Sequence, residues 1–234
     1  FSRRLVSAVR GAIERGEQVM LFLNRRGFAT QLQCLQCGYV AACEQCSANY
    51  TYHRAQGQLI CHLCGAFRPV PSVCPECEDP QIKYSGLGTE RIESICREVF
   101  PSAKVLRMDS DTMTSKGAYR EALTGFRAGT YDLLVGTQMI AKGLHFPNVT
   151  LVGIIMADST LNLPDFRAGE RTFQLLVQVA GRAGRGELPG RVIVQTYTPY
   201  HVAIQTALRL DYDGFYEDAM KARRELVLPP VGHL

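Results

Sequence analysis

Hydrophobic positions along the chain alternate between two patterns, one typical of helices and one typical of buried strands. Apolar residues recur at helical spacing from Leu5 to Ile13, and Gly16 ends that helix. The unbroken apolar run from Val19 to Leu23 follows, and a run this short predicts a strand that is buried on both faces. The first unit of the fold is therefore expected to be a helix followed by a core strand.

After a cysteine-rich stretch the same alternation resumes. Thr89 is the expected N-cap of a helix that carries Ile92, Ile95 and Val99. The remaining elements are predicted as strands at 104–108, 132–135, 149–156 and 191–196, and as helices at 116–127 and 168–180. Short apolar strands that alternate with amphipathic helices predict an α/β fold, with a parallel sheet covered by helices on both faces.

Eight of the nine cysteines form four Cys-x-x-Cys pairs, which are Cys34/Cys37, Cys43/Cys46, Cys61/Cys64 and Cys74/Cys77. Each pair sets two thiolates on one side of a tight turn, and two such turns can close a tetrahedral zinc site. A disulfide framework is the alternative. Because no charged leader with an apolar stretch opens the sequence, export is not indicated and two structural zinc ions are expected.

The stretch between Cys46 and Cys61 indicates which pairs share a metal. Residues 49–60 have the pattern of a hairpin with a Gly-containing turn, and a hairpin brings its two ends together. The inner site is therefore expected to be Cys43, Cys46, Cys61 and Cys64, and the outer site Cys34, Cys37, Cys74 and Cys77. This nesting places Gln33 next to Glu78, so the unit can be inserted into another domain without disturbing it.

The sequence thus predicts a discontinuous sheet domain. The predicted parts are the sheet domain at 1–33 and 78–200, the zinc-binding insertion at 34–77, and the helical start of a truncated domain at 201–234. The chain begins with Phe1 rather than Met, so we expect a piece of a longer protein. No apolar run approaches the roughly 18 residues that a membrane-spanning helix needs, so no membrane contact is expected.

Charge adds a bias toward phosphate. The 234 residues carry a formal net charge of +4, and 21 of the 26 basic residues are Arg. The Arg fork matches phosphate geometry, which favours contacts with nucleotides or nucleic acid. A genome composition that favours Arg codons would explain the same bias.

Three segments stand out as candidate ligand sites. In an open parallel sheet, ligands bind outside the carboxyl ends of the strands, so the residues that follow each strand carry most weight. Residues 24–27 follow the first strand, residues 136–143 follow a later strand, and residues 178–186 close the long helix. In the last segment, Arg182 and Arg185 are flanked by glycines and can reach together into a crevice to hold a polyphosphate.

Each segment has a simpler alternative. Arg182 and Arg185 could compensate a helix dipole, residues 136–143 could be an ordinary Gly turn, and Arg25 and Arg26 could be a solvated pair. The sequence also lacks the Gly-x-x-x-x-Gly-Lys-Ser/Thr loop, and no apolar strand ends in an Asp-Glu pair. We therefore expect the chain to supply only the opposing wall of an ATP site.

Together these segments resemble motifs IV, V and VI of the superfamily 2 helicases. The matching segments are residues 22–27, 86–90, 136–139, 141–143 and 178–185. With the paired cysteines, the chain is similar over essentially its whole length to the bacterial replication-restart helicases. The resemblance implies a RecA-like second helicase lobe with an inserted two-zinc subdomain, taken from an ATP-driven enzyme that moves 3′ to 5′ on single-stranded DNA.

The resemblance also implies how nucleotide is bound. Arg185 and Arg182 would act as arginine fingers on the γ-phosphoryl group, and Gln178 would orient that segment or the attacking water. Gly143 would belong to the cofactor-binding residues. The cofactors would be two structural zinc ions and ATP with Mg²⁺, the magnesium being held mainly by a first lobe outside this sequence.

For DNA, the resemblance implies contacts with the sugar-phosphate backbone. Thr137 and Gln138 would touch that backbone, and Arg25 and Arg26 would hold phosphates without regard to sequence. The implied partners are forked and single-stranded DNA, primosome proteins, single-stranded DNA-binding protein and the machinery that loads the replicative helicase. The implied location is the bacterial cytoplasm, in association with the nucleoid.

Two other functions stay open on the sequence. The chain could be a non-enzymatic zinc-ribbon module that binds nucleic acid or protein without ATP, or a different zinc-bearing translocase that acts on RNA. Tyr39, Tyr50 and Tyr52 are expected to pack the core of the zinc unit, although with Arg54 they could instead stack on a single strand.

The remaining polar and titratable residues receive structural roles. Because eight thiolates already fill two sites, His53 and His62 are not expected to bind metal. Cys96 is predicted to be a buried thiol, and Asp109 and Asp111 are predicted to cap a helix. Asp158 and His201 belong to no motif that the sequence supports.

Overall fold

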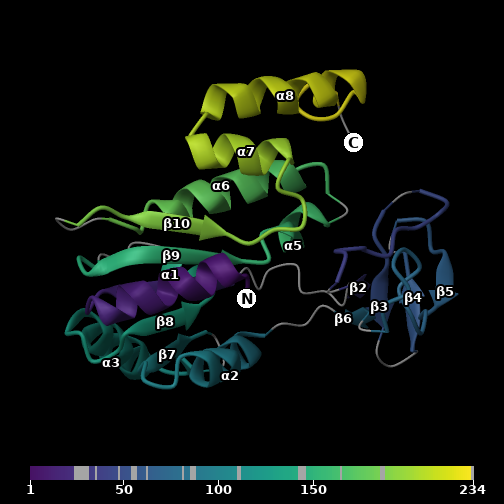
Figure 1. Ribbon diagram of the computed structural model, residues 1–234. Coiled ribbons are helices and arrows are strands. Elements are labelled where there is room, and N and C mark those ends of the chain that lie inside the picture. Colours follow the sequence, from purple (N-terminus) through teal and green to yellow (C-terminus); the bar gives the residue numbers. More distant parts are fainter. Residues whose placement is uncertain are drawn as a thin grey trace.

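The structure, a computed structural model, describes residues 1–23, 32–34, 36–46, 48–53, 57–61, 63–80, 82–84, 88–109, 112–141, 146–163, 165–184 and 188–232. Figure 1 shows a helix-covered sheet, a small cysteine-rich unit beside it and two further helices stacked on one of its sides.

A parallel sheet of five strands forms the centre of the larger unit, in the order β10-β9-β1-β8-β7. The strands are β1 (Gln18–Leu23), β7 (Val105–Met108), β8 (Leu133–Gly136), β9 (Val149–Ile155) and β10 (Arg191–Val194). Every residue of β1, β8 and β9 is buried, because helices cover the sheet on both sides. The predicted α/β fold is confirmed.

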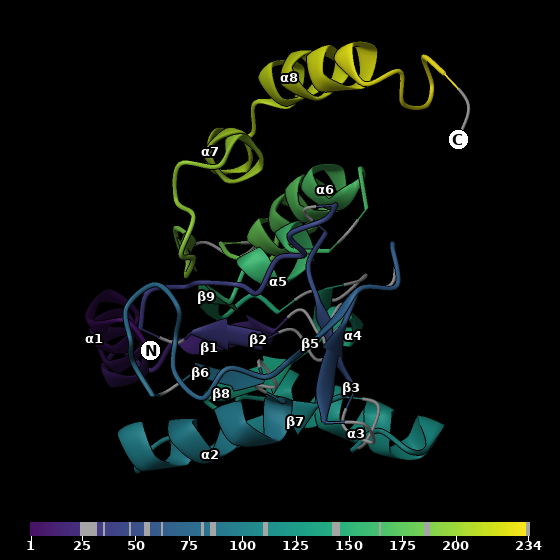
Figure 2. The ribbon, with the colours of Figure 1, turned by 90° about the vertical axis from the view of Figure 1, so that its right-hand side faces the viewer.

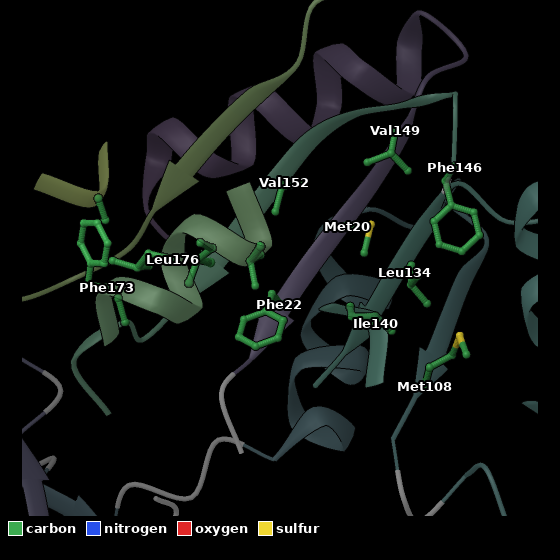
Figure 3. Close-up of a cluster of buried hydrophobic side chains, with 14 of the residues drawn as sticks. Met20, Phe22, Met108, Leu134, Ile140, Phe146, Val149, Val152, Phe173 and Leu176 are labelled. Carbon is green, nitrogen blue, oxygen red and sulfur yellow. The ribbon is translucent and has the colours of Figure 1, made fainter. Parts of the chain in front are cut away.

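Helices divide between the two faces of the sheet. One face carries α1 (Arg3–Glu14) and α2 (Thr89–Val99), which bury Leu5, Ile92 and the Cys96 thiol against the strands. The other face carries α3 (Lys116–Arg127), the short α4 (Gln138–Ala141) and α6 (Ala168–Ala180). In the core on that side, Phe22 of β1 lies among side chains from α4, α6 and the neighbouring strands (Figure 3).

The last helices continue this second face outward. The helix α7 (Val202–Arg209) packs on α6, and α8 (Tyr212–Glu225) packs on α7. Phe215 of α8 also stacks on Phe173 of α6, with ring centroids 4.5 Å apart. Among the helices described, none combines the length and the apolar content that a membrane span requires.

Several element boundaries differ from the sequence prediction by one or two residues. Gly88 is the N-cap of α2 and Thr89 is its first residue, because the Thr89 hydroxyl donates a hydrogen bond to the Asp109 carboxylate instead of capping the helix. The last strand stops at Val194, and residues 196–198 form a turn. Asp109 accepts from the N–H of Thr112 at 2.9 Å, so it closes a turn after β7 rather than a helix; Asp111 lies outside the described residues.

Five short strands between residues 32 and 84 build the cysteine-rich unit and its stem. Its stem pairs β2 (Leu32–Cys34) with β6 (Ile82–Tyr84), and its body holds β3 (Thr51–His53), β4 (Gln58–Ile60) and β5 (Phe67–Pro69). The predicted hairpin is confirmed as the antiparallel pair β3 and β4 (Figure 1), and Figure 2 shows the molecule with the cysteine-rich unit toward the viewer. Across the stem, Gln33 pairs with Lys83, so the prediction that Gln33 lies next to Glu78 is wrong.

Candidate metal centres and ligand-binding edges

Eight cysteines gather into two groups of four. The groups are Cys34, Cys37, Cys74 and Cys77 (outer) and Cys43, Cys46, Cys61 and Cys64 (inner), and within each the sulfur atoms lie within 4.8 Å of one another. This grouping is the one that the hairpin argument predicts. Closest sulfur pairs are 3.6 Å apart in the outer group and 3.4–3.6 Å in the inner group. A tetrahedral Zn–S₄ site with bonds of about 2.3 Å has edges of about 3.8 Å, so both groups fit zinc.

One backbone turn, here called a knuckle, builds these sites repeatedly. After the second cysteine of a pair, the next N–H donates to the first cysteine's carbonyl, as from Gly38 to Cys34 at 3.0 Å and from Gly65 to Cys61 at 2.9 Å. This turn needs a positive φ, which is 81° at Gly38 and 77° at Gly65. Glu78 makes the same turn with a φ of 57°.

Hydrogen bonds give the two thiols of the Cys43/Cys46 knuckle different pKa values. Burial raises the pKa of Cys43, but N–H groups of its knuckle and the Tyr50 hydroxyl donate to its sulfur and bring the pKa to about 6. At Cys46 an N–H bond lowers the pKa, but hydrogen bonding to Cys61 and burial raise it to about 12. Burial also raises the pKa of Cys34, but backbone N–H donors bring it to about 7, and such donors likewise lower the pKa of Cys61. These three thiols are thus ready to bind a cation, and a bound metal would deprotonate the others.

Tyr50 and Arg68 lie behind the cysteines of the inner site. Tyr50 is 4% exposed, and its hydroxyl donates to the Cys43 sulfur. The Arg68 guanidinium lies 5.7 Å from the centre of the Tyr50 ring and pairs with Glu44 at 3.4 Å. Tyr50 therefore lies in the unit's core, as predicted, and Tyr39 and Tyr52 pack against that core. The contact with sulfur has no signature in the sequence.

The carboxyl edge of the sheet carries one of the predicted DNA-contact residues. Thr137 directly follows β8, is 7% exposed, and its carbonyl accepts from the N–H of Ile140 at 3.0 Å. Arg25, Arg26 and Gly143 lie outside the described residues, as does the side chain of Gln138. Their predicted roles stay predictions.

The segment that closes α6 lies at the opposite edge. The N–H of Gly184 donates to the carbonyl of Val149, the first residue of β9, at 3.1 Å. This corrects the expectation that all three candidate segments gather at the carboxyl ends of the strands. Gln178 and the half-buried Arg182 belong to the last turn of α6 and the turn after it, whereas Arg185 lies outside the described residues.

Asp158, which belongs to no sequence motif, has a structural role. Its carboxylate is 3% exposed and accepts the Thr196 and Thr198 hydroxyls, both at 2.6 Å. The N–H groups of Tyr197 and Thr198 also donate to it, each at 3.1 Å. Asp158 therefore fixes the turn at 196–198 to the end of β9. No spacing in the sequence predicts this contact, because the residues that donate to Asp158 lie about forty positions later in the chain.

His201 has a capping role. Its Nδ1 accepts from the N–H of Ala203 at 3.1 Å and caps α7. Burial lowers the pKa of His201, against the opposing effect of the Asp218 and Asp158 carboxylates. Cys96 is buried as predicted, and burial raises the pKa of its thiol to about 12.

Two family models match the chain. The helicase conserved C-terminal domain matches residues 82–187, and the Cys-rich region domain of PriA DNA helicase matches residues 43–69. Among solved structures, the chain is similar to the yeast DEAD-box splicing factor Prp28, with 10% identity and a TM-score of 0.44 over 96% of this chain and 34% of that one. That likeness is too distant to add to the argument.

Curated relatives match the entire chain. The replication restart protein PriA of Bacillus subtilis is 52% identical over 234 residues, which are 100% of this chain and 29% of that protein. The PriA proteins of Synechocystis and Treponema pallidum are each 46% identical over 100% of this chain, which covers 29% and 36% of their lengths. The chain therefore belongs to the PriA family of replication restart proteins.

Proposed function

We propose that this chain is the second motor lobe of an ATP-dependent DNA helicase that restarts replication. The observation that carries the proposal is the position of the α6 end, which Gly184 ties to the first residue of β9. There Gln178 and Arg182 lie at an edge of the sheet whose neighbouring residues 188–191 are exposed. A first lobe that carries nucleotide could approach this edge without meeting the cysteine-rich unit, which is inserted after the carboxyl end of β1.

The proposed chemistry at this edge is electrostatic. ATP with Mg²⁺ would supply the phosphoryl group that is transferred to water, and it would be held mainly by a lobe outside this sequence. Arg185, with Arg182, would stabilise the charge that develops on the γ-phosphoryl oxygens. Gln178 would orient the arginines or the attacking water. Gly143, which follows α4 in the sequence, would complete the nucleotide contacts.

DNA would bind along the other edge of the sheet. Thr137 follows β8 at the carboxyl end, and Gln138, Arg25 and Arg26 follow strands that end at the same edge. Contacts from these residues to phosphates would be independent of sequence, as a translocase requires. Movement from 3′ to 5′ on forked and single-stranded DNA and assembly with primosome proteins are parts of the same proposal.

Zinc would have a structural role. Two ions would be held, one by each group of four thiolates, and such a site leaves no open position for a substrate. The domain boundaries at 33/34, 77/78 and 200/201 stay predictions, although the β2–β6 stem favours a somewhat longer insertion.

The test is the Arg185→Ala substitution in the complete protein. We expect DNA-stimulated ATP hydrolysis to fall by roughly 10³- to 10⁵-fold while binding to forked DNA stays near normal. The matched control is Arg191→Ala, because Arg191 is exposed at the start of β10 near the same edge. Normal hydrolysis by the Arg185 variant would contradict the arginine-finger role.

A further inference from the structure

The outer zinc knuckle touches the sheet domain at one closely packed point. A Cβ atom added to Gly38 would lie 2.7 Å from both Cβ and Cγ of Tyr197, which is shorter than side chains tolerate. Gly38 directly follows the ligand Cys37, and Tyr197 lies in the turn after β10. The backbone of the knuckle therefore lies against the Tyr197 ring, and only glycine permits this approach.

Asp158 holds Tyr197 in position from the other side. Both carboxylate oxygens lie near the Tyr197 N–H, at 3.2 and 3.1 Å, and the hydroxyls on either side of Tyr197 also donate to this carboxylate. A turn that is fixed by a buried carboxylate cannot shift its side chain freely. The Tyr197 ring is thus a rigid part of the sheet domain, although it is 41% exposed.

Asp158 is the first residue of the short helix α5 (Asp158–Leu161), and a second contact with the cysteine-rich unit lies at the other end of that helix. The Asn49 side-chain amide donates to the carbonyl of Asn162, the C-cap residue of α5. Asn49 comes from the inner knuckle's side of the unit, where it forms a bridge with Ala42. One contact would leave the unit free to pivot, whereas contacts at the start and at the end of α5 fix its orientation.

Figure 1 shows α5 on the side of the sheet domain that faces the cysteine-rich unit. Helix α5 also packs against α6, the helix that ends with Gln178 and Arg182. We propose that α5 and the turn at 196–198 form a seat for the cysteine-rich unit, with Tyr197 and Asp158 as positioning residues that make unit and sheet domain one rigid body. The proposed function enters only in its consequence, since a moving lobe would then carry the unit with it.

The chain contains a matched control for this seat. Gly38 and Gly65 follow the second cysteine of their knuckles, make the same turn and have φ values of 81° and 77°. A Cβ at Gly65 would meet nothing within 4 Å, whereas one at Gly38 would meet Tyr197. Gly38→Ala and Gly65→Ala therefore impose the same backbone strain, and only the first disturbs the seat.

The experiment measures ¹⁵N relaxation of the zinc-loaded chain, with metal content determined for each variant. The backbone order parameters of residues 36–46 and 63–80 are calculated with the rotational diffusion of the sheet domain as the overall motion. In the wild type they should be about 0.85. In Gly38→Ala and in Tyr197→Ala they should fall below about 0.6, while the sheet domain keeps its melting temperature. Gly65→Ala and Tyr200→Ala should match the wild type, because a Cβ at Gly65 would meet nothing within 4 Å and Tyr200 is 91% exposed.

The outcomes separate cleanly. If Gly38→Ala loses the outer zinc, Tyr197→Ala decides, because Tyr197 lies outside the cysteine-rich unit and its substitution leaves the backbone of the knuckle unchanged. Independent tumbling of the unit in the wild type, or unchanged order parameters in zinc-loaded Tyr197→Ala, would overturn the proposal. Neither readout involves ATP, so failure here would leave the proposed motor function untouched, and failure of the motor function would leave the seat untouched.

Discussion

The hydroxyl of Tyr50 donates a hydrogen bond to the sulfur of Cys43, and the Tyr50 ring carries the Arg68 guanidinium on its face. A donor to a thiolate withdraws charge from it and fixes its direction, so this bond orients one ligand of the inner site. The outer-shell partner of a metal ligand thus comes from the core of the unit.

Tyr50→Phe should weaken zinc binding at the inner site only. The substitution removes the O–H donor and keeps the ring, so the fold of the unit should persist. Loss of an outer-shell partner typically lowers metal affinity by about 10- to 100-fold, and we expect the lower end of that range. Competition with a chromophoric chelator should then show one weakened and one unchanged site. Tyr39→Phe is the control, and equal effects of the two substitutions would contradict this role of Tyr50.

Metal analysis should find two zinc ions per chain. Cys37→Ser should leave one ion, in the inner site, because the two groups share no ligand. Removal of both ions by a chelator should unfold the cysteine-rich unit while the sheet domain, which has its own core, stays folded. A wild-type content of one ion or none would show that the grouping does not reflect metal binding.

The chain alone should not hydrolyse ATP. It carries no phosphate-binding loop of the Gly-x-x-x-x-Gly-Lys-Ser/Thr type, and its arginines can act only on nucleotide that another lobe holds. Phosphate release should stay at the level of the buffer when single-stranded DNA is added. Turnover stimulated by DNA would refute the two-lobe proposal.

Asp158→Asn should destabilise the sheet domain by about 3 kcal/mol, because hydrogen bonds to a buried carboxylate are strong and an amide would turn a donor toward donors. Urea unfolding of the zinc-loaded chain measures this change. Asp165→Asn is the control, since Asp165 is 23% exposed and pairs with Arg171 on the surface, and its cost should stay below about 1 kcal/mol. If the two substitutions lower the free energy of unfolding equally, the hydrogen bonds of Asp158 are no stronger than those of a surface carboxylate.

His201 should make the free energy of unfolding of the chain depend on pH. Because burial lowers its pKa below 6.5, the unfolded chain binds a proton at a higher pH than the folded chain does. The contribution of His201 is therefore complete above pH 6.5 and is lost as the pH falls through that value toward the folded pKa. In His201→Asn the amide oxygen can still cap α7, without titrating. The wild type should lose stability relative to this variant as the pH falls below 6.5, and parallel curves would contradict the assignment.

Much of the fold could be predicted because the signals are local. The buried strands and covering helices follow from the spacing of apolar residues, and the cysteine grouping follows from one hairpin between Cys46 and Cys61. The N-cap of α2 is misplaced by one residue because the Thr89 hydroxyl is bound by Asp109, a contact between distant residues.

The candidate site was harder to predict for the same reason. The α6 end lies at the amino edge because a helix that links two parallel strands must run back across the sheet, a rule that could have placed it. The contacts of Asp158 with 196–198 and of Gly38 with Tyr197 join segments far apart in sequence. No periodicity or spacing encodes such contacts, so only the structure reveals them.

Helix α6 begins beside α5 and ends near Val149, so its thirteen residues, about 20 Å at 1.5 Å per residue, span the sheet along the direction of its strands. One inserted or deleted residue would turn its far end by about 100° and displace Arg182 from its place. Relatives should therefore tolerate substitutions in helix α6 far more readily than insertions or deletions that change its length.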